Sequence, residues 1–228
     1  MSGPRVVIAT PHARHDAIEA SVRDRLGLEV LRVRTPSELD ARALAAFKPR
    51  FIFFPHWSWK IPAGIYEGFE CVIFHMTDLP FGRGGSPLQN LVVRGIAETQ
   101  LTALRCVAAL DAGPIYLKCP LSLLGTAEEI LLRASKLTGE MIENIVREQP
   151  MPQLQVGEPV IFRRRTPLDG DLADLKGLEQ VFNYIRMLDA DGYPPAFIET
   201  EHFRLEFRRA SLKPDSIIAD VKIFRKES

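Results

Sequence analysis

The chain has 228 residues, of which 46% are hydrophobic, and its 29 Lys and Arg residues balance its 29 Asp and Glu residues. This length and apolar content suit one α/β domain of roughly 150 residues with a smaller appendage, and they exclude extended disorder. A net charge of zero provides no field that attracts a polyanion, so a nucleic acid is not expected as the main partner.

Strands and helices are expected to alternate in the first part of the chain. Short apolar runs rich in β-branched residues predict buried parallel strands, and helical periodicity between them predicts crossover helices. The fold class predicted is therefore α/β, with a doubly wound, mostly parallel sheet of the Rossmann-like type. In chain order we expect strands at 5–10, 28–33, 51–54 and 71–74, and helices at 16–26, at 36–47 with Thr35 as N-cap, and at 62–67.

The longest helix is expected to begin after Thr126. Thr126 and Glu129 form a capping box, and apolar residues recur at helical spacing as far as Ile145. This helix should cover one face of the sheet.

A change in composition marks a domain boundary. Between residues 150 and 166 the chain is rich in Pro, Gln and Gly and contains three consecutive arginines, which is typical of a linker. We therefore predict a larger domain at 1–150 and a small α+β C-terminal domain at 151–228. The latter should contain an amphipathic helix at 175–188 and a half-buried strand at 203–207.

Three cysteines, Cys71, Cys106 and Cys119, lie far apart in apolar stretches. No CxxC pair or Cys/His cluster predicts a zinc site, so we interpret them as reduced core thiols and expect no metal. The N-terminal segment lacks the apolar run of a secretory signal, and no window reaches the ~18 apolar residues that span a bilayer. The expected location is the cytoplasm, without a membrane partner.

Two histidines should lie where ligands bind. His75 and His56 both follow apolar strand runs, and ligands of parallel sheets gather beyond the carboxyl ends of the strands. Asp111 lies 36 positions after His75, and a carboxylate can orient a histidine that exchanges protons near neutral pH. His12 and His15 flank a polar helix start, and we interpret both as solvated.

The loop that follows His75 contains glycines and one arginine. Ser86 as N-cap and Pro87 at the first helical position predict a helix N-terminus near Arg83 and Gly84, where backbone N–H groups and a guanidinium can bind an anion. Taken alone, the loop is equally well explained by a turn that needs glycines.

These motifs together resemble the folate-dependent formyltransferase family. The shared order is a strand, His75, Leu79-Pro80, Arg83-Gly84, a helix-opening proline and Asp111-x-Gly-x-Ile, over residues 51–118 and more loosely over 1–150. The family includes methionyl-tRNA formyltransferase and the N-formyltransferases of nucleotide-linked amino sugars. The resemblance implies catalytic roles for His75 and Asp111 and N10-formyltetrahydrofolate as co-substrate.

One position departs from the family pattern. The family has Asn-x-His, whereas this chain has Ile73-Phe74-His75, so an oxyanion donor is missing. Removing one such donor typically lowers a rate by about a hundredfold to a thousandfold. Candidate substitutes are Asn90, Thr77 and His56, among which the sequence does not choose.

Two further stretches resemble the sugar formyltransferases. Residues 55–62 match their pterin-binding stretch, which implies folate contacts from Trp57, Trp59 and Lys60 and from Val107, Leu110 and Asp111; surface packing explains the tryptophans equally well. Residues 183–188 and 192–197 match a nucleotide-holding signature. The residues implied to contact the substrate are Arg83, Gly84, Ser86, Asn90, Arg186 as a phosphate clamp, and Tyr193 or Phe197 as a base-stacking platform.

The resemblance implies formyl transfer to the amine of a UDP-linked or dTDP-linked 4-amino-dideoxy sugar, as in pseudaminic-acid-type or O-antigen glycan biosynthesis. Three alternatives stay open: another amine such as hydroxyornithine or methionyl-tRNA, hydrolysis of the folate, and a folate-binding or nucleotide-binding relative without turnover, which Ile73 favours. The apolar strand face of the appendage would suit a homodimer.

Overall fold

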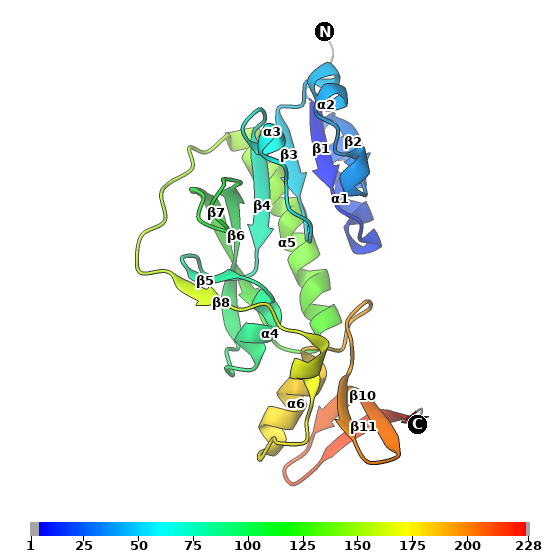
Figure 1. Cartoon of the computed structure of the whole chain (residues 1–228). Coiled ribbons are helices and arrows are strands. Elements are labelled where there is room, and N and C mark those ends of the chain that lie inside the picture. The colour runs from blue at the N-terminus through cyan, green and yellow to red at the C-terminus, as the bar shows by residue number, and fades with distance from the viewer. Residues whose placement is uncertain (1–4, 227–228) are drawn as a thin grey trace. The chain divides into compact units, whose positions relative to one another are not determined.

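The computed structural model describes residues 5–226, and its largest sheet has six strands in the order β2-β1-β3-β4-β6-β7 (Figure 1). β1 pairs in parallel with β2 and β3, β3 pairs in parallel with β4, and β4 pairs antiparallel with β6. The predicted doubly wound, mostly parallel α/β fold is therefore confirmed. The strands are β1 (Arg5–Ala9), β2 (Glu29–Val33), β3 (Phe51–Phe54), β4 (Cys71–His75), β6 (Glu98–Arg105) and β7 (Ile115–Ser122).

Helices cover both faces of this sheet. On one face α1 (Asp16–Leu26) contacts α5 (Ala127–Glu148), and Ser21 Oγ donates to Glu143 Oε1 at 2.7 Å. On the other face α2 (Ala41–Phe47) and α3 (Ala63–Tyr66) contribute to an apolar cluster with residues of the strands. The cluster comprises Val7, Ala9, Val33, Leu39, Leu44, Ile52, Phe54, Ile61, Ile65, Cys71 and Cys106.

Some predicted elements differ from the structure. The helix predicted at 36–47 is a 3-10 turn at Pro36–Glu38 followed by α2, and Asp40 caps α2 by accepting from the Ala43 N–H at 2.7 Å. Thr35 therefore does not cap that helix. The strands β6 and β7 were not expected; β7 contains Pro120, which is tolerated because β7 lies at the sheet edge.

The capping box of α5 is present as predicted. The Thr126 N–H donates to Glu129 Oε2 at 2.7 Å, and the Glu129 N–H donates to Thr126 Oγ1 at 3.3 Å. Two N–H groups that have no partner within the helix are satisfied in this way.

The chain divides into two compact units that interleave in sequence. The first comprises the chain up to Arg83, Gln100–Leu121 and Leu132–Ile161, and the second comprises Gly84–Thr99, Ser122–Leu131 and the chain from Phe162 onwards. The boundary proposed between residues 150 and 166 stays a prediction.

The remaining strands and α-helices are β5 (Phe81–Gly84) paired with β8 (Val160–Phe162), α4 (Pro87–Val92), α6 (Leu178–Arg186), and an antiparallel sheet of β9 (Ala196–Glu199), β10 (Phe203–Leu212) and β11 (Ile217–Arg225).

Candidate functional site

His75 and Asp111 meet in the first unit. His75 is the last residue of β4, and Asp111 lies in the loop between β6 and β7. The His75 Nδ1 atom lies 3.6 Å from Asp111 Oδ2, and each residue exposes 8% of its surface. This distance is too long for a hydrogen bond but suits an ion pair when the ring is protonated. The Asp111 carboxylate is therefore placed to stabilise the positive charge of a protonated His75 ring.

The other ring nitrogen of His75 binds the backbone. His75 Nε2 lies 2.8 Å from the Gly82 carbonyl oxygen, to which Thr77 Oγ1 donates at 3.5 Å. Because a carbonyl oxygen only accepts, Nε2 carries the hydrogen and donates it. Thr77 is held in turn by Thr102, whose Oγ1 donates to the Thr77 carbonyl at 2.7 Å. The ring is thereby oriented with Nδ1 toward Asp111.

The loop that carries Asp111 has an unusual backbone. Asp111 has a φ of 51°, in the left-handed region that most side chains avoid and that Asp tolerates better than most. A Cβ atom added to Gly113 would lie 1.8 Å from the Arg105 carbonyl oxygen, so only glycine fits there. The Arg105 N–H donates to the Pro114 carbonyl at 2.8 Å and closes the loop.

A contact that the sequence analysis missed joins this loop to Arg83. Arg83 Nε and Nη2 donate to Gln155 Oε1 at 3.0 and 2.7 Å. Gln155 Nε2 donates to the carbonyl oxygens of Asp111 and Gly113, each at 2.8 Å. Gln155 lies in the stretch interpreted as a linker, where a single glutamine is no signal of a role.

The three candidate oxyanion donors have different surroundings. Asn90 Nδ2 donates to the carbonyls of Gly85 and Arg163, at 3.0 and 2.9 Å, so both of its N–H groups are already used. Thr77 is fully buried and donates to Gly82. His56 is half-buried, and its Nδ1 is a buried atom without a hydrogen-bond partner among the described residues. Ile73 is partly buried and packs against the apolar cluster.

The loop before α4, predicted to bind an anion at a helix N-terminus capped by Ser86, lacks that cap. Ser86 precedes α4, but its side chain does not cap that helix; Ser86 Oγ accepts from the Arg165 N–H at 3.0 Å. A Cβ atom added to Gly84 would lie 2.4 Å from the Phe162 carbonyl oxygen, so Gly84 is required for packing. The alternative interpretation, a turn that needs glycines, therefore accounts for Gly84.

The predicted folate contacts lie in two loops of the first unit. Trp57 is half-buried and packs edge to face against Phe54 and Trp59, with ring centroids 5.7 and 4.8 Å apart. Lys60 and Leu110 are exposed, and Val107 is half-buried. Folate binding by these residues stays a proposal.

The predicted nucleotide contacts in the second unit are largely used by the protein itself. Arg186 is buried, and its guanidinium donates to the carbonyls of Leu123 and Gly125, at 2.6 and 2.9 Å, and to Asn183. Phe197 is 3% exposed, and the Arg204 guanidinium lies 3.7 Å from its ring centre, so a base-stacking role does not agree with the structure. Tyr193 is half-buried.

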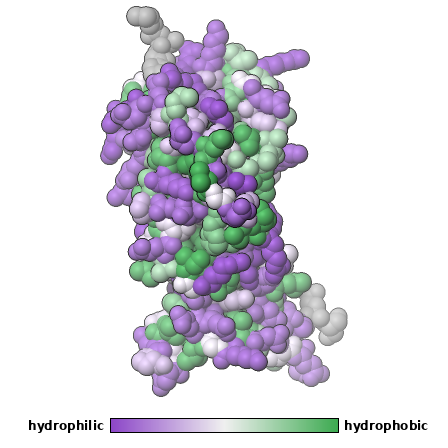
Figure 2. Space-filling view, turned by 90° about the vertical axis from the view of Figure 1, so that its left-hand side faces the viewer, coloured by the Kyte–Doolittle hydropathy of each residue, from purple (hydrophilic) through white to green (hydrophobic). Residues whose placement is uncertain are grey.

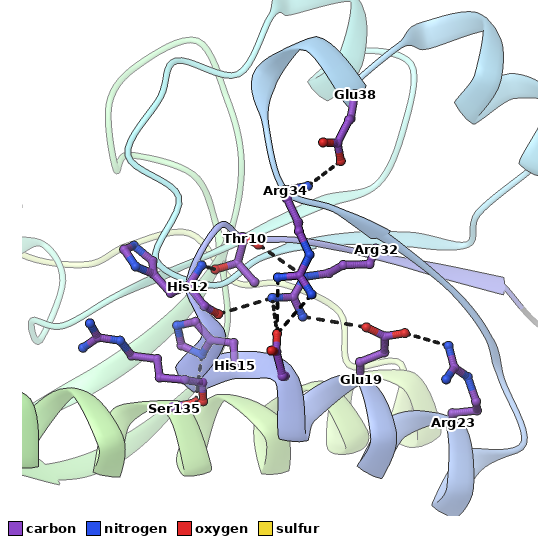
Figure 3. Close-up of polar contacts among 11 residues, drawn as sticks. Thr10, His12, His15, Glu19, Arg23, Arg32, Arg34, Glu38 and Ser135 are labelled. Atoms are coloured by element: carbon purple, nitrogen blue, oxygen red, sulfur yellow. Dashed lines mark hydrogen bonds and ion pairs between the residues drawn. The ribbon is translucent and has the colours of Figure 1, made fainter. Parts of the chain in front are cut away.

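The prediction that His12 and His15 are solvated is wrong for His15. His15 exposes 4% of its surface, and its ring and the His12 ring both lie near His56, with centroids 6.4 and 4.4 Å from the His56 ring. Ser135 Oγ donates to the Arg14 carbonyl and therefore accepts from His15 Nδ1 at 2.8 Å. Figure 3 shows His15 next to Ser135 on the helix that contributes it. Tertiary packing against α5 buries the ring.

Arg32 and Asp16 hold the loop that carries these histidines. Arg32 Nε donates to the Thr10 carbonyl at 3.2 Å, and its Nη2 donates to the His12 carbonyl at 3.3 Å and to Asp16 Oδ1 at 2.9 Å (Figure 3). Arg34 also lies near Asp16, at 3.5 Å.

The histidine cluster predicts a loss of stability in acid. Burial, with the nearby charges of His12 and Arg14, lowers the pKa values of His15 and His56 to about 3. At pH values between the usual pKa of 6.5 and the lowered pKa of about 3, these histidines are protonated in the unfolded chain but not in the folded chain. The free energy of unfolding therefore falls as the pH falls through this range. We expect a decline of at most about 1.4 kcal/mol per pH unit for each histidine.

Urea unfolding from pH 7.5 down to pH 4 measures this decline. The double variant His15→Gln, His56→Gln should show a shallower dependence on pH than the wild type. Equal slopes in the two proteins would contradict the prediction.

The three cysteines are free thiols; Cys71 and Cys106 are buried in the core as expected, whereas Cys119 is only half-buried. Burial raises the pKa of Cys71 above its usual range and, together with the charge of Asp111, raises that of Cys106 to about 11. Burial also raises the pKa of Cys119. Because the thiolate is the nucleophilic form, these cysteines are poor nucleophiles at neutral pH.

Residues 5–226 contain neither a metal-binding cluster of side chains nor a membrane-spanning helix. Within this range no group of three or more His, Cys, Asp or Glu side chains is arranged to hold a metal ion. Within the same range no helix has the length and hydropathy needed to cross a membrane.

Comparisons with known proteins agree with the fold. The family described as methionyl-tRNA formyltransferase, C-terminal domain, matches residues 167–224. A methionyl-tRNA formyltransferase from Gluconobacter oxydans is 26% identical over 210 residues, which are 88% of this chain and 66% of the relative. The chain thus spans less than two thirds of that relative's length.

Solved structures extend the likeness. The methionyl-tRNA formyltransferase from Clostridium thermocellum is 44% identical with a TM-score of 0.94, over 98% of this chain and 100% of that chain. The formyltransferase PseJ from Anoxybacillus kamchatkensis, in complex with UDP-4,6-dideoxy-4-formamido-L-AltNAc and tetrahydrofolate, is 17% identical with a TM-score of 0.57, over 70% of this chain and 85% of that chain, and shares the fold alone. With the 44% identity over nearly its whole length, the chain belongs to the formyltransferase family.

Proposed function

We propose that the chain transfers a formyl group from N10-formyltetrahydrofolate to the primary amine of a nucleotide-linked 4-amino-dideoxy sugar. The observation that carries the formyl transfer is the buried pair of His75 and Asp111, 3.6 Å apart, in a chain of the formyltransferase family. An imidazole held beside a carboxylate is suited to move the single proton that this reaction transfers.

The reaction requires one proton to change place. The neutral amine attacks the formyl carbon, a carbon–nitrogen bond forms, and the carbonyl oxygen becomes an oxyanion. The bond from the formyl carbon to folate N10 then breaks, the amine loses one proton and N10 gains one. In this proposal His75 takes the proton of the amine or stabilises the oxyanion, and Asp111 holds the charge of the ring and relays a proton toward N10.

The charge of the C-terminal part supports a nucleotide sugar as the acceptor. Residues 162–228 contain 12 Lys and Arg and 12 Asp and Glu residues, so their formal charge is zero. Binding of a tRNA draws most of its affinity from phosphate contacts with a basic surface. A sugar nucleotide requires far fewer such contacts.

Methionyl-tRNA is the second candidate acceptor. It is favoured by the 44% identity to a protein named methionyl-tRNA formyltransferase. Hydroxyornithine has no specific support in the structure.

A panel of acceptors tests the proposal. The protein is incubated with N10-formyltetrahydrofolate and one of several UDP- or dTDP-linked 3-amino or 4-amino sugars, or with methionyl-tRNA, and tetrahydrofolate release and product mass are followed. We expect release that requires a UDP- or dTDP-linked 4-amino sugar and a product heavier by one formyl group. Release only with methionyl-tRNA would overturn the sugar proposal, and equal release without an acceptor would show hydrolysis.

The same assay tests whether Ile73 impairs the reaction. If the missing donor limits turnover, Ile73→Asn should raise the rate of transfer, because an amide at this position would restore the Asn-x-His pattern two residues before His75. Tetrahydrofolate binding without any turnover, in the wild type and in Ile73→Asn, would show a binding protein instead.

A further inference from the structure

The segment between α5 and β8 exposes its apolar side chains and turns a polar one inward. Met151, Leu154 and Val156 expose 80%, 81% and 88% of their surface, whereas Gln155 is half-buried. The segment runs as an irregular loop along the left side of Figure 1. Figure 2 views the protein from that side and shows hydrophobic residues at the surface. Since apolar burial normally orients a segment, another interaction must orient this one.

The hydrogen bonds of Gln155 supply that interaction. Its Oε1 accepts two N–H groups of Arg83, and its Nε2 donates to the carbonyls of Asp111 and Gly113. A guanidinium only donates and a carbonyl oxygen only accepts, so the amide fits in one orientation alone. All four hydrogen bonds have lengths between 2.7 and 3.0 Å.

Backbone contacts on either side hold Gln155 in place. Gln153 forms an antiparallel bridge with Ile115 of β7, in which the two N–H groups donate at 2.7 and 2.8 Å. The Val160 N–H donates to the Pro80 carbonyl at 3.3 Å. The glutamine therefore acts from a segment that is tied to the sheet rather than from a free loop.

We infer that Gln155 is a positioning residue of the formyl-transfer site. Its two donated hydrogen bonds hold the carbonyl groups of Asp111 and Gly113 and so stabilise the left-handed backbone of Asp111, from which the carboxylate reaches His75. Through Arg83, it also joins this loop to β5. The inference rests on the proposed function for its effect on catalysis, but the hydrogen bonds can be tested without it.

Two substitutions separate the two halves of the contact. Gln155→Met keeps the length of the side chain and removes all four hydrogen bonds. Gln155→Glu keeps acceptors for Arg83 and removes the donors to Asp111 and Gly113. Gln153→Met is the matched control, because the Gln153 side chain is exposed and its backbone bridge does not depend on it.

Three measurements decide the inference. In Gln155→Met and Gln155→Glu, hydrogen exchange of the Arg105 and Ala112 amides, which donate to the Pro114 and Ala109 carbonyls in this loop, should be faster by about tenfold or more, because the loop opens locally. The kcat should fall about tenfold to a hundredfold, with KM for the folate changed by less than about threefold, because the carboxylate is displaced rather than the folate lost. The Tm should fall by only a few degrees, as about 1 kcal/mol implies.

The outcomes distinguish failure of the inference from failure of the proposed function. If the wild type transfers no formyl group to any acceptor, the proposed function is overturned, and hydrogen exchange alone decides the role of Gln155. Exchange of the Arg105 and Ala112 amides as slow as in Gln153→Met would overturn the inference. So would an active wild type whose kcat changes less than about twofold in Gln155→Met, or a change in Gln153→Met as large as in Gln155→Met.

Discussion

Replacing His75 with Asn should lower the kcat of formyl transfer by about a hundredfold to ten-thousandfold, the range typical for loss of a general acid or base. An asparagine side chain can still donate a hydrogen bond toward Gly82, but it cannot exchange a proton with Asp111. The fall should therefore appear in kcat, while the affinity for tetrahydrofolate, measured by calorimetry, changes little.

Asp111→Asn is the companion change. Asparagine tolerates the φ of 51° at this position better than alanine does, so the variant removes the charge without adding backbone strain. We expect a similar loss of kcat, and the double variant His75→Asn, Asp111→Asn should lose little more than either single variant, because the two groups act as one unit.

An exposed histidine provides the matched control. The His202 side chain is 71% exposed and lies 3.9 Å from the carboxylate of Glu201, so His202→Asn removes a similar pair at the surface. Its kcat should equal that of the wild type. Full activity in His75→Asn, or an equal loss in His202→Asn, would refute the catalytic role of His75.

Gly113→Ala should disrupt the loop of Asp111. An alanine Cβ atom at the present position would lie 1.8 Å from the Arg105 carbonyl oxygen. That oxygen belongs to the end of β6, where the Arg105 N–H also binds Pro114, so the loop has to move away from the sheet. We expect the free energy of unfolding to fall by about 2–4 kcal/mol and kcat to fall about a hundredfold or more, because a shift of about 1 Å misplaces the carboxylate.

Gly64→Ala is the control for this change. Gly64 lies in α3, and a Cβ atom added there would meet nothing within 4 Å. Urea unfolding should show a stability equal to that of the wild type or slightly higher, because alanine favours helix more than glycine does. A Gly113→Ala protein with wild-type stability and activity would show that the loop adapts without cost.

Hydrophobic patterns in the sequence were sufficient to predict the bounds of some helices and strands. The helix predicted at 16–26 and the strand at 51–54 have those bounds in the structure, because hydrophobic periodicity and apolar runs act within one element. The helix predicted at 36–47 was too long, since Asp40 offers an N-cap closer to the apolar residues of α2 than Thr35 does. The strands β6 and β7 were not predicted, because β6 pairs with β4 and β7 lies beside β6 at the sheet edge, and the periodicity of either segment alone does not reveal these partners.

By itself, the sequence determined the α/β class, the alternation of strands and helices in the first part of the chain, and the pair of His75 and Asp111, because these follow from residue types and their spacing. Only the tertiary structure decided which polar groups are already bonded: Asn90 and Arg186 bind backbone carbonyls, and Gln155, in a stretch without any motif, holds the loop of Asp111. The physical reason is that a hydrogen-bond partner far away in the chain is chosen by the packing of whole elements, which no local pattern contains.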